Sequence, residues 1–281
     1  MFPSVALFLI FNLIPVVMAI YYSFFNWSGG KTMKFIGITN YIRLLQDGVF
    51  GKAIWNNLIL AFFCVVFQVG IAFVISSLLC TKMLKCKAFH QFAIFMPVIL
   101  APVVVGFLWK IIYNADYGLL NFFLRAIGQE KLIQAWLDNP DIVMKAITIP
   151  IVWQWIGMYV VMLVSAMKNI SGEIIESAVL DGANGIQRTL YITWPLVLDT
   201  VKVSIVLAVS GCMKLFEHIY IITGGGPGNA SMVGAMYAYK TSFIKQKFGY
   251  GSTISVGIML TSLTMVMLVN IIFGKGKKRY G

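Results

Sequence analysis

A chain of 281 residues, of which 59% are hydrophobic and 11% are charged, lies outside the composition range of soluble domains. Its mean hydropathy of +0.86 indicates a protein that resides in a lipid bilayer. The formal net charge of +12 is explained by basic loops at a membrane surface, so a nucleic-acid partner is not needed to account for it.

Six apolar segments are predicted to cross the membrane as helices. Each has about 20 residues, which is enough to cross a hydrocarbon core of roughly 30 Å with all backbone hydrogen bonds satisfied internally. The sequence therefore predicts an all-α, polytopic membrane protein whose residues 1–281 form a single transmembrane domain. The predicted segments are residues 3–24, 57–80, 89–113, 142–167, 200–222 and 253–273.

The first segment can be read as a cleaved signal peptide or as a retained helix. It lacks a basic n-region, is longer than an h-region of roughly 7–15 residues, and has no small-residue cleavage site before Tyr21. These features favour a retained helix.

Orientation is predicted from Lys and Arg in the short loops. The basic residues divide about evenly between the two sides, but one set is packed into shorter loops, where the positive-inside rule acts most strongly. We therefore expect the 81–88 loop, the 168–199 loop and both termini to lie in the cytoplasm. That set comprises Lys82, Lys85, Lys87, Lys168, Arg188 and the Lys-Gly-Lys-Lys-Arg stretch at 275–279.

No metal site is predicted. The four cysteines show neither metal-ligand spacing nor an obvious disulfide pairing, and both histidines are isolated along the sequence. We interpret the cysteines as packing residues. The residues concerned are Cys64, Cys80, Cys86, Cys212, His90 and His218.

A polar stretch separates the fourth and fifth predicted segments. Ser171 is a suitable N-cap, Glu176 falls early in the helix where the dipole favours acidic residues, and Gly182 and Gly185 allow the helix to end and turn. The pattern predicts a short amphipathic helix over about 171–183. Such a helix could also simply lie on the membrane surface.

The full motif favours another role for this helix. The sequence Glu-Ser-Ala-Val-Leu-Asp-Gly-Ala at 176–183, followed by Ile192 and Pro195, resembles the Glu-Ala-Ala loop of binding-protein-dependent ABC importer permeases. Ser177 replaces the second residue of the triplet, and Trp194 replaces the Leu before the proline. In that family the loop docks into a groove of the ATPase.

Further elements support the same resemblance. Gly-Ile-Thr-Asn-Tyr at 37–41, Tyr-Gly-Leu-Leu-Asn at 117–121 and Thr-Gly-Gly-Gly-Pro at 223–227 are similar to motifs of the sugar-type permeases and follow one another in the same order. The glycines of the last motif can adopt positive φ. We expect the loop at 223–229 to lie at the outer mouth, facing the binding protein.

The resemblance implies a type I ABC importer permease in a bacterial cytoplasmic membrane, surrounded by membrane lipid. Such a subunit is not an enzyme. It pairs with a second, related permease and two ATPase subunits, and an extracytoplasmic solute-binding protein delivers its cargo. No Gly-x-x-x-x-Gly-Lys-[Ser/Thr] phosphate loop occurs in the sequence, so ATP and Mg²⁺ are expected on the ATPase and no cofactor on this chain. The implied ATPase-coupling residues are Glu176, Ala178, Asp181, Gly182, Ala183 and Pro195.

Aromatic and hydrogen-bonding residues cluster in the fourth and fifth predicted segments. This combination suits sugars, whose C–H faces stack on aromatic rings and whose hydroxyls need partners. Resemblance to maltose-type permeases implies a carbohydrate cargo, with a pathway along two facing helix stripes. Trp109 and Tyr113 are interpreted as membrane-interface anchors. The predicted pathway residues are Gln154, Trp155, Met158, Ser210, Met213, Lys214 and Glu217.

Lys214 and Glu217 are ionisable residues in a predicted membrane helix, where each costs at least about 2.5–3.5 kcal/mol. Three residues apart on one helix, they would share a face and could pair. A bracing ion pair and a contact to substrate both remain open at this point. If Lys214 is free to meet cargo, an acidic, uronate-type oligosaccharide becomes the alternative cargo.

Two other functional classes are less well supported. An ion-coupled secondary transporter would show inverted repeats, broken helices and a buried carboxylate; Glu217 is the one candidate carboxylate and no repeat is visible. A membrane-embedded enzyme would need a catalytic constellation within the apolar segments, and the sequence contains none.

Overall fold

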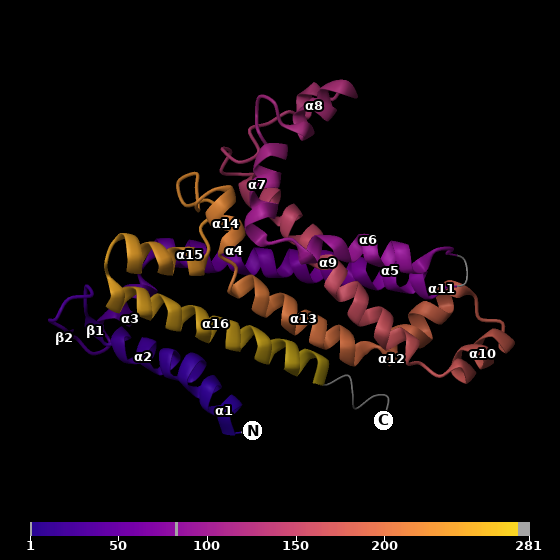
Figure 1. The fold of residues 1–281 in the computed structure, drawn as a ribbon, viewed down its shortest axis with the longest axis horizontal. Helices are drawn as coiled ribbons and strands as arrows, with labels where there is room; N and C mark the ends of the chain where they lie inside the picture. Colours follow the sequence, from indigo (N-terminus) through magenta and orange to yellow (C-terminus); the bar gives the residue numbers. More distant parts are fainter. Residues whose placement is uncertain (1, 82–83, 275–281) are drawn as a thin grey trace.

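The computed structural model describes residues 2–81 and 84–274. Lys82 and the basic stretch at 275–279, which entered the orientation prediction, lie outside the described residues. In the described part the all-α prediction is confirmed, with one short antiparallel strand pair, Phe25–Asn26 (β1) and Lys34–Phe35 (β2). The long helices run roughly in one direction and form an elongated bundle (Figure 1).

Four described stretches are long and apolar enough to cross a membrane. Two bent helix pairs, 87–99 with 102–112 and 185–196 with 198–213, raise the number to as many as six. The first stretch is α1 (Phe2–Phe8), η1 (Leu9–Leu13) and α2 (Ile14–Ser23); the second is α4 (Gly48–Cys64), η2 (Val65–Val69) and α5 (Gly70–Cys80); the third is α9 (Val143–Lys168); the fourth is α16 (Phe248–Gly274). Each overlaps a predicted segment. The second starts earlier than residue 57 because Asp47 caps α4 at Gly48, its carboxylate accepting from the backbone N–H of Val49 and Phe50.

The predicted straight helix over 89–113 is wrong. The structure has two helices, α6 (Lys87–Ile99) and α7 (Pro102–Ile112), which meet at 96°. Pro102 has no N–H to continue a helix and pushes Ala101 into extended backbone, with ψ 137°. The freed carbonyl of Leu100 accepts a hydrogen bond of 2.8 Å from Nε2 of Gln154.

The predicted helix over 200–222 is also interrupted. It consists of α13 (Leu198–Met213) and the short α14 (Glu217–Ile222), joined by residues 214–216. Near the end of α13 the carbonyl of Cys212 accepts a 2.6 Å hydrogen bond from Nδ2 of Asn57 on α4. A side chain of another membrane helix thus supports the backbone at the break, as the apolar environment requires.

The centre of the bundle is α9, which packs on both α5 and α6. It crosses α6 very closely at Gly157, where a Cβ would lie 2.3 Å from the carbonyl oxygen of Ile94 and 2.8 Å from Cα of Phe95. Gly106 of α7 faces Ile221 of α14 in a similar close contact. Glycine at these two positions therefore allows the helices to approach.

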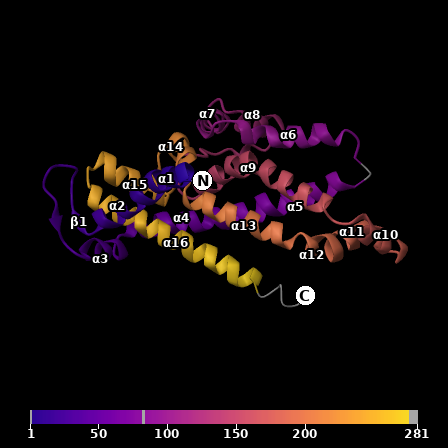
Figure 2. The same cartoon turned by 60° about the horizontal axis from the view of Figure 1, so that its bottom comes forward.

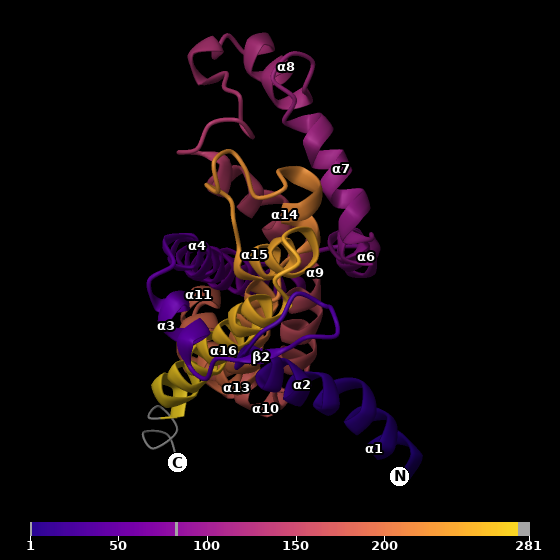
Figure 3. The same cartoon turned by 90° about the vertical axis from the view of Figure 1, so that its left-hand side faces the viewer.

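The two ends of the bundle differ. At one end lie β1, β2 and α3, with α15 beside them; α10 and α11 lie at the other, and α1 begins and α16 ends away from the strand pair (Figures 1 and 2). α7 and α8 project sideways from the bundle (Figure 3). The remaining elements are α3 (Thr39–Leu45), α8 (Leu119–Ala126), η3 (Glu130–Leu132), α10 (Gly172–Leu180), α11 (Gly185–Arg188), η4 (Thr189–Thr193), α12 (Trp194–Leu196), α15 (Gly234–Tyr239) and η5 (Lys240–Ile244).

The predicted interface anchors Trp109 and Tyr113 lie inside an aromatic cluster. Tyr113 is only 2% exposed, and its hydroxyl donates to the carbonyl of Ala146. Its ring lies 5.2 Å from that of Trp109, which in turn contacts Trp153. The interpretation of Tyr113 as an interface anchor is therefore wrong, because α9 buries it.

Asp47 joins three helices at the strand end of the bundle. One carboxylate oxygen caps α4, while Oδ2 accepts hydrogen bonds from the hydroxyls of Tyr237 on α15 and Tyr250 on α16, at 2.6 and 2.5 Å. Burial tends to raise the pKa of Asp47, but the hydrogen bonds from Tyr237, Tyr250 and the backbone N–H of Phe50 and Val49 outweigh it and hold the pKa below its usual 3.8.

The lowered pKa of Asp47 predicts that its contribution to the stability of the fold depends on pH. A carboxyl group with a folded-state pKa below its unfolded value stabilises the fold above about pH 4 and loses that contribution as the pH falls through the folded-state pKa. The thermal midpoint of Asp47→Asn should thus lie well below that of the parent protein at about pH 6, and the gap should narrow below about pH 4. Asp116→Asn, at an exposed loop carboxyl group, is the control. A difference in thermal midpoint between Asp47→Asn and the parent protein that does not change with pH would contradict the prediction.

Candidate functional site

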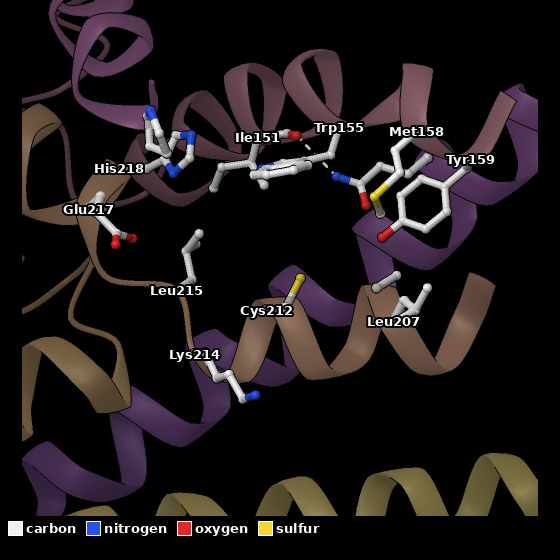
Figure 4. A pocket seen from close by; sticks show the side chains of 14 residues that line it. Ile151, Trp155, Met158, Tyr159, Leu207, Cys212, Lys214, Leu215, Glu217 and His218 are labelled. Atoms are coloured by element: carbon white, nitrogen blue, oxygen red, sulfur yellow. Dashed lines mark hydrogen bonds between the residues drawn. The ribbon is translucent and has the colours of Figure 1, made fainter. Parts of the chain in front are cut away.

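A cavity of about 330 Å³ opens between α9, α13 and the break that follows α13 (Figure 4). Trp155 lies along one wall, His218 and Glu217 lie at one end, and Lys214 and Cys212 lie on the opposite side. The lining residues are Gln68, Pro102, Ile151, Trp155, Met158, Tyr159, Leu207, Ala208, Gly211, Cys212, Lys214, Leu215, Glu217 and His218.

The structure brings some predicted pathway residues together at this cavity and not others. Trp155, Met158, Lys214 and Glu217 line it. Ser210 is half-buried outside the lining, and the fully buried Gln154 and Met213 belong to the interior of the bundle. Successive residues of a helix point about 100° apart. The α9 face that meets the cavity accordingly contains Ile151, Trp155, Met158 and Tyr159, and Gln154 points elsewhere.

Gln154 instead connects the break between α6 and α7 with the start of α14, which follows the break after α13. Its amide nitrogen donates to the carbonyl of Leu100, so its oxygen faces Nε2 of His218 at 2.6 Å. Nε2 of His218 must therefore carry the proton that it donates. In the neutral ring Nδ1 is then an acceptor, and this atom is buried without a hydrogen-bond partner among the described residues.

His218 was missed by the sequence reasoning, which treated it as isolated. It is 1% exposed and lines the cavity. The available signal was a histidine beside a glutamate in an apolar segment, but its partner Gln154 lies 64 residues away. In the described ranges, no group of three or more His, Cys, Asp or Glu side chains could hold a metal ion.

The predicted helical pair of Lys214 and Glu217 is wrong. α13 ends at Met213, Lys214 is its C-cap and α14 starts at Glu217, so the two residues do not share a helix face. Their side chains point in different directions in Figure 4. In the part of the chain that the structure describes, no ion pair joins them. Both are exposed at the cavity instead.

The coupling loop forms the predicted helix, somewhat shorter than expected. α10 covers Gly172–Leu180, with Ser171 at the N-cap position and Asp181 as C-cap. Gly182 has φ +80°, which confirms the predicted turn, whereas Gly185 starts α11. Asn184 and Gln187 cap α11 reciprocally, a capping box that the sequence reasoning missed.

The predicted coupling residues divide between surface and interior. Glu176, Asp181 and Gly182 are exposed, Ala183 and Pro195 are half-buried, and Ala178 is buried within this chain. Leu180, an apolar position of the predicted helix that was not counted among the coupling residues, is 88% exposed at the end of α10.

The loop at 223–232, which contains the predicted outer motif, is held by a side chain of α4 and by Lys240. Gly224, Gly225 and Gly228 have φ of +61°, +88° and +51°, so the predicted positive φ is confirmed. Nζ of Lys240 donates to the carbonyl of Gly224 at 2.7 Å. Nδ2 of Asn56 donates to the carbonyls of Ala230 and Met232. The loop is thus fixed directly after α14.

Residues 88–274, which include both the cavity and α10, match the family described as binding-protein-dependent transport system inner membrane component. The chain belongs to this family. It is therefore a multi-pass permease of the cytoplasmic membrane in a binding-protein-dependent transport system, and it is a transport subunit, not an enzyme.

Two relatives extend the similarity over nearly the whole permease. The chain is 34% identical to the probable ABC transporter permease protein YurN of Bacillus subtilis (strain 168), covering 96% of this chain and 94% of YurN. It is 30% identical to the diacetylchitobiose uptake system permease protein NgcF of Streptomyces coelicolor, covering 97% of this chain and 81% of NgcF.

A solved structure shares the fold of the permease. It is a chain of a bacterial ABC transporter involved in the import of the acidic polysaccharide alginate, with a TM-score of 0.84 and 20% sequence identity over 97% of this chain and 93% of that chain. At this level of identity the likeness concerns the arrangement of the helices alone.

Proposed function

We propose that this permease is the membrane-spanning subunit of an ATP-driven importer and passes a neutral oligosaccharide through the 330 Å³ cavity. The observation that carries the proposal is the chemistry of the cavity wall. The Trp155 ring offers a flat face for a sugar ring, while the exposed carboxylate of Glu217 accepts hydrogen bonds from hydroxyls. NgcF, a relative named for diacetylchitobiose uptake, supports a carbohydrate cargo.

Charge at the cavity favours a neutral over an acidic sugar. Lys214 and Glu217 place one cation and one anion at its lining. A uronate oligosaccharide would gain from Lys214 but would be repelled by Glu217. A hydroxyl-rich neutral ring can donate to the carboxylate and accept from the ammonium, so it uses both groups.

The proposed assembly contains a second, related permease, two ATPase subunits that hold ATP and Mg²⁺, and an extracytoplasmic binding protein that delivers the sugar. This chain acts as one permease domain over residues 1–281 and binds no cofactor of its own. The 168–199 loop and both termini lie in the cytoplasm. Support comes from the exposed Leu180 within the motif and from the positions of α10 and the strand pair at opposite ends of the bundle (Figure 1).

Replacing Trp155 with alanine tests the cargo proposal. In the reconstituted importer, sugar-dependent transport should fall by about tenfold, equal to about 1.4 kcal/mol, because the stacking face is removed. Basal ATP hydrolysis should be retained. Trp153→Ala, two residues away on α9 but packed against Trp109 outside the cavity lining, is the matched control. Equal transport in the Trp155 and Trp153 variants would reject the cavity as the sugar pathway.

Lys214→Met separates neutral from acidic cargo in the same assay. With a neutral oligosaccharide as cargo, the variant should keep most of its transport, since Glu217, His218 and Trp155 remain. Selective loss of uronate uptake, measured with labelled neutral and uronate oligosaccharides in parallel, would instead identify an acidic sugar as the cargo.

A further inference from the structure

A second cavity, of about 190 Å³, lies at the end of the bundle that carries α10. It is formed by the end of α5, the beginning of α6 and the end of α9, toward the same end of the bundle as α10 and α11 (Figure 1). None of the predicted coupling or pathway residues lines it. Its lining residues are Leu79, Cys80, Lys87, Gln91, Val164, Met167 and Lys168.

The polar part of this cavity is cationic. Lys87 and Lys168 both line it, with Gln91 one helical turn after Lys87, and no acidic residue is among the lining. Within residues 2–81 and 84–274, neither lysine forms an ion pair. Two ammonium groups in one small cavity repel each other unless an anion lies between them.

The position of Lys87 on α6 also indicates a bound anion. Lys168 lies in the last turn of α9, where the helix dipole favours a cation, so its placement has an ordinary structural explanation. Lys87 is the first residue of α6, at the end of the dipole that favours an anion. α6 has no acidic residue in its first turn and no side-chain cap. A bound anion would offset both unfavourable features.

The other part of the cavity is apolar. Leu79, Val164 and Met167 form this part. A soluble anion would gain nothing from these apolar side chains. A cationic recess with an apolar floor, at the end of membrane-crossing helices, matches a headgroup phosphate with attached acyl chains better than it matches a soluble anion.

We propose that the cavity between α5, α6 and α9 binds the phosphate of an anionic phospholipid, held by Lys87 and Lys168, with its acyl chains beginning at Leu79, Val164 and Met167. Lys168 is followed after three residues by α10. A lipid held there joins the end of α9 to α6, and so fixes the base from which the coupling helix extends. The proposal does not depend on the identity of the transported sugar.

The test uses the purified importer in vesicles of phosphatidylcholine alone or with about 25 mol% phosphatidylglycerol. Lys87→Gln/Lys168→Gln should retain about tenfold less phosphatidylglycerol on extraction, as measured by mass spectrometry, and should lose the lipid-dependent rise in thermal midpoint. Lys85→Gln/Lys145→Gln removes the same charge from an exposed loop residue and from the opposite end of α9, and should behave like the parent protein.

Three outcomes would overturn the proposal. Equal retention of phosphatidylglycerol by both double variants would exclude the cavity as its site. Inorganic phosphate that stabilises the parent protein in phosphatidylcholine as well as phosphatidylglycerol does would identify a soluble anion as the ligand. Loss of ATPase binding by Lys87→Gln/Lys168→Gln to the same extent in both vesicle types would assign the lysines to a protein contact. None of these readouts measures sugar transport, so failure here leaves the proposed cargo untouched.

Discussion

Replacing Gly157 with alanine should destabilise the permease more than any other single-methyl addition discussed above. The new Cβ would meet the carbonyl oxygen of Ile94 at 2.3 Å and Cα of Phe95 at 2.8 Å. Both atoms belong to the α6 backbone, which cannot rotate away as a side chain can. We expect a cost at or above the upper end of the roughly 1–3 kcal/mol typical of overpacking. The measurements are the yield of monodisperse protein and its thermal midpoint in detergent.

Gly70 provides the matched control for Gly157. It is also helical, and a Cβ there would have no atom within 4 Å. Gly70→Ala should therefore be neutral or should stabilise slightly, by about 0.5–1 kcal/mol from reduced backbone freedom. Gly106→Ala should fall between the two, because its contact is with the movable side chain of Ile221. A parent-like midpoint for Gly157→Ala would mean that α6 and α9 do not cross as described.

Gly182→Val should separate ATP hydrolysis from transport without removing the permease from the membrane. Gly182 has φ +80°, and a Cβ there would meet no atom within 4 Å, so the penalty is purely conformational. That penalty is roughly 1–2 kcal/mol for a side-chain-bearing residue, and a β-branched residue tolerates such a φ poorly. It would disturb the turn in which the N–H of Ala183 donates to the carbonyl of Ala178. Transport and ATPase rates are measured together in proteoliposomes.

Gly172→Val is the control for the turn, because Gly172 begins the same helix with no neighbour within 4 Å and no positive φ. Leu180→Asp and Glu176→Lys should reproduce the uncoupling without altering the backbone, since both side chains are exposed. A single cysteine at position 180, in a background without the native cysteines, should be labelled from the cytoplasmic side. Coupled transport in all three loop variants would refute the docking role of α10.

Much of the fold and part of the site were predictable from local patterns. The four uninterrupted spans follow from apolar runs that are long enough to cross a bilayer, so the predicted 142–167 nearly coincides with α9. The coupling helix and its turn follow from Ser171, Gly182 and the motif between them, which act over one or two helical turns. The resemblance to maltose-type permeases likewise pointed to Trp155 and Met158, which line the cavity.

Proline shows why the helix breaks were not predictable in the same way. Pro97 and Pro150 lie inside α6 and α9, whereas Pro102 begins a new helix after a sharp bend. The residue type is the same in each case. What differs is whether a partner elsewhere in the chain can accept or donate the hydrogen bonds that a break sets free.

The sequence by itself therefore determined the class of protein, the uninterrupted spans and the helix α10 with its turn, because these depend on hydrophobicity and on turn residues close together in the chain. The tertiary structure decided where the third and fifth spans bend and which residues line the cavity. Gln154 supports the break at Leu100 from 54 residues away, and Asn57 supports the end of α13 from 155 residues away. A buried carbonyl in an apolar environment must find a hydrogen-bond partner. Which residue becomes that partner is decided only by how the helices pack.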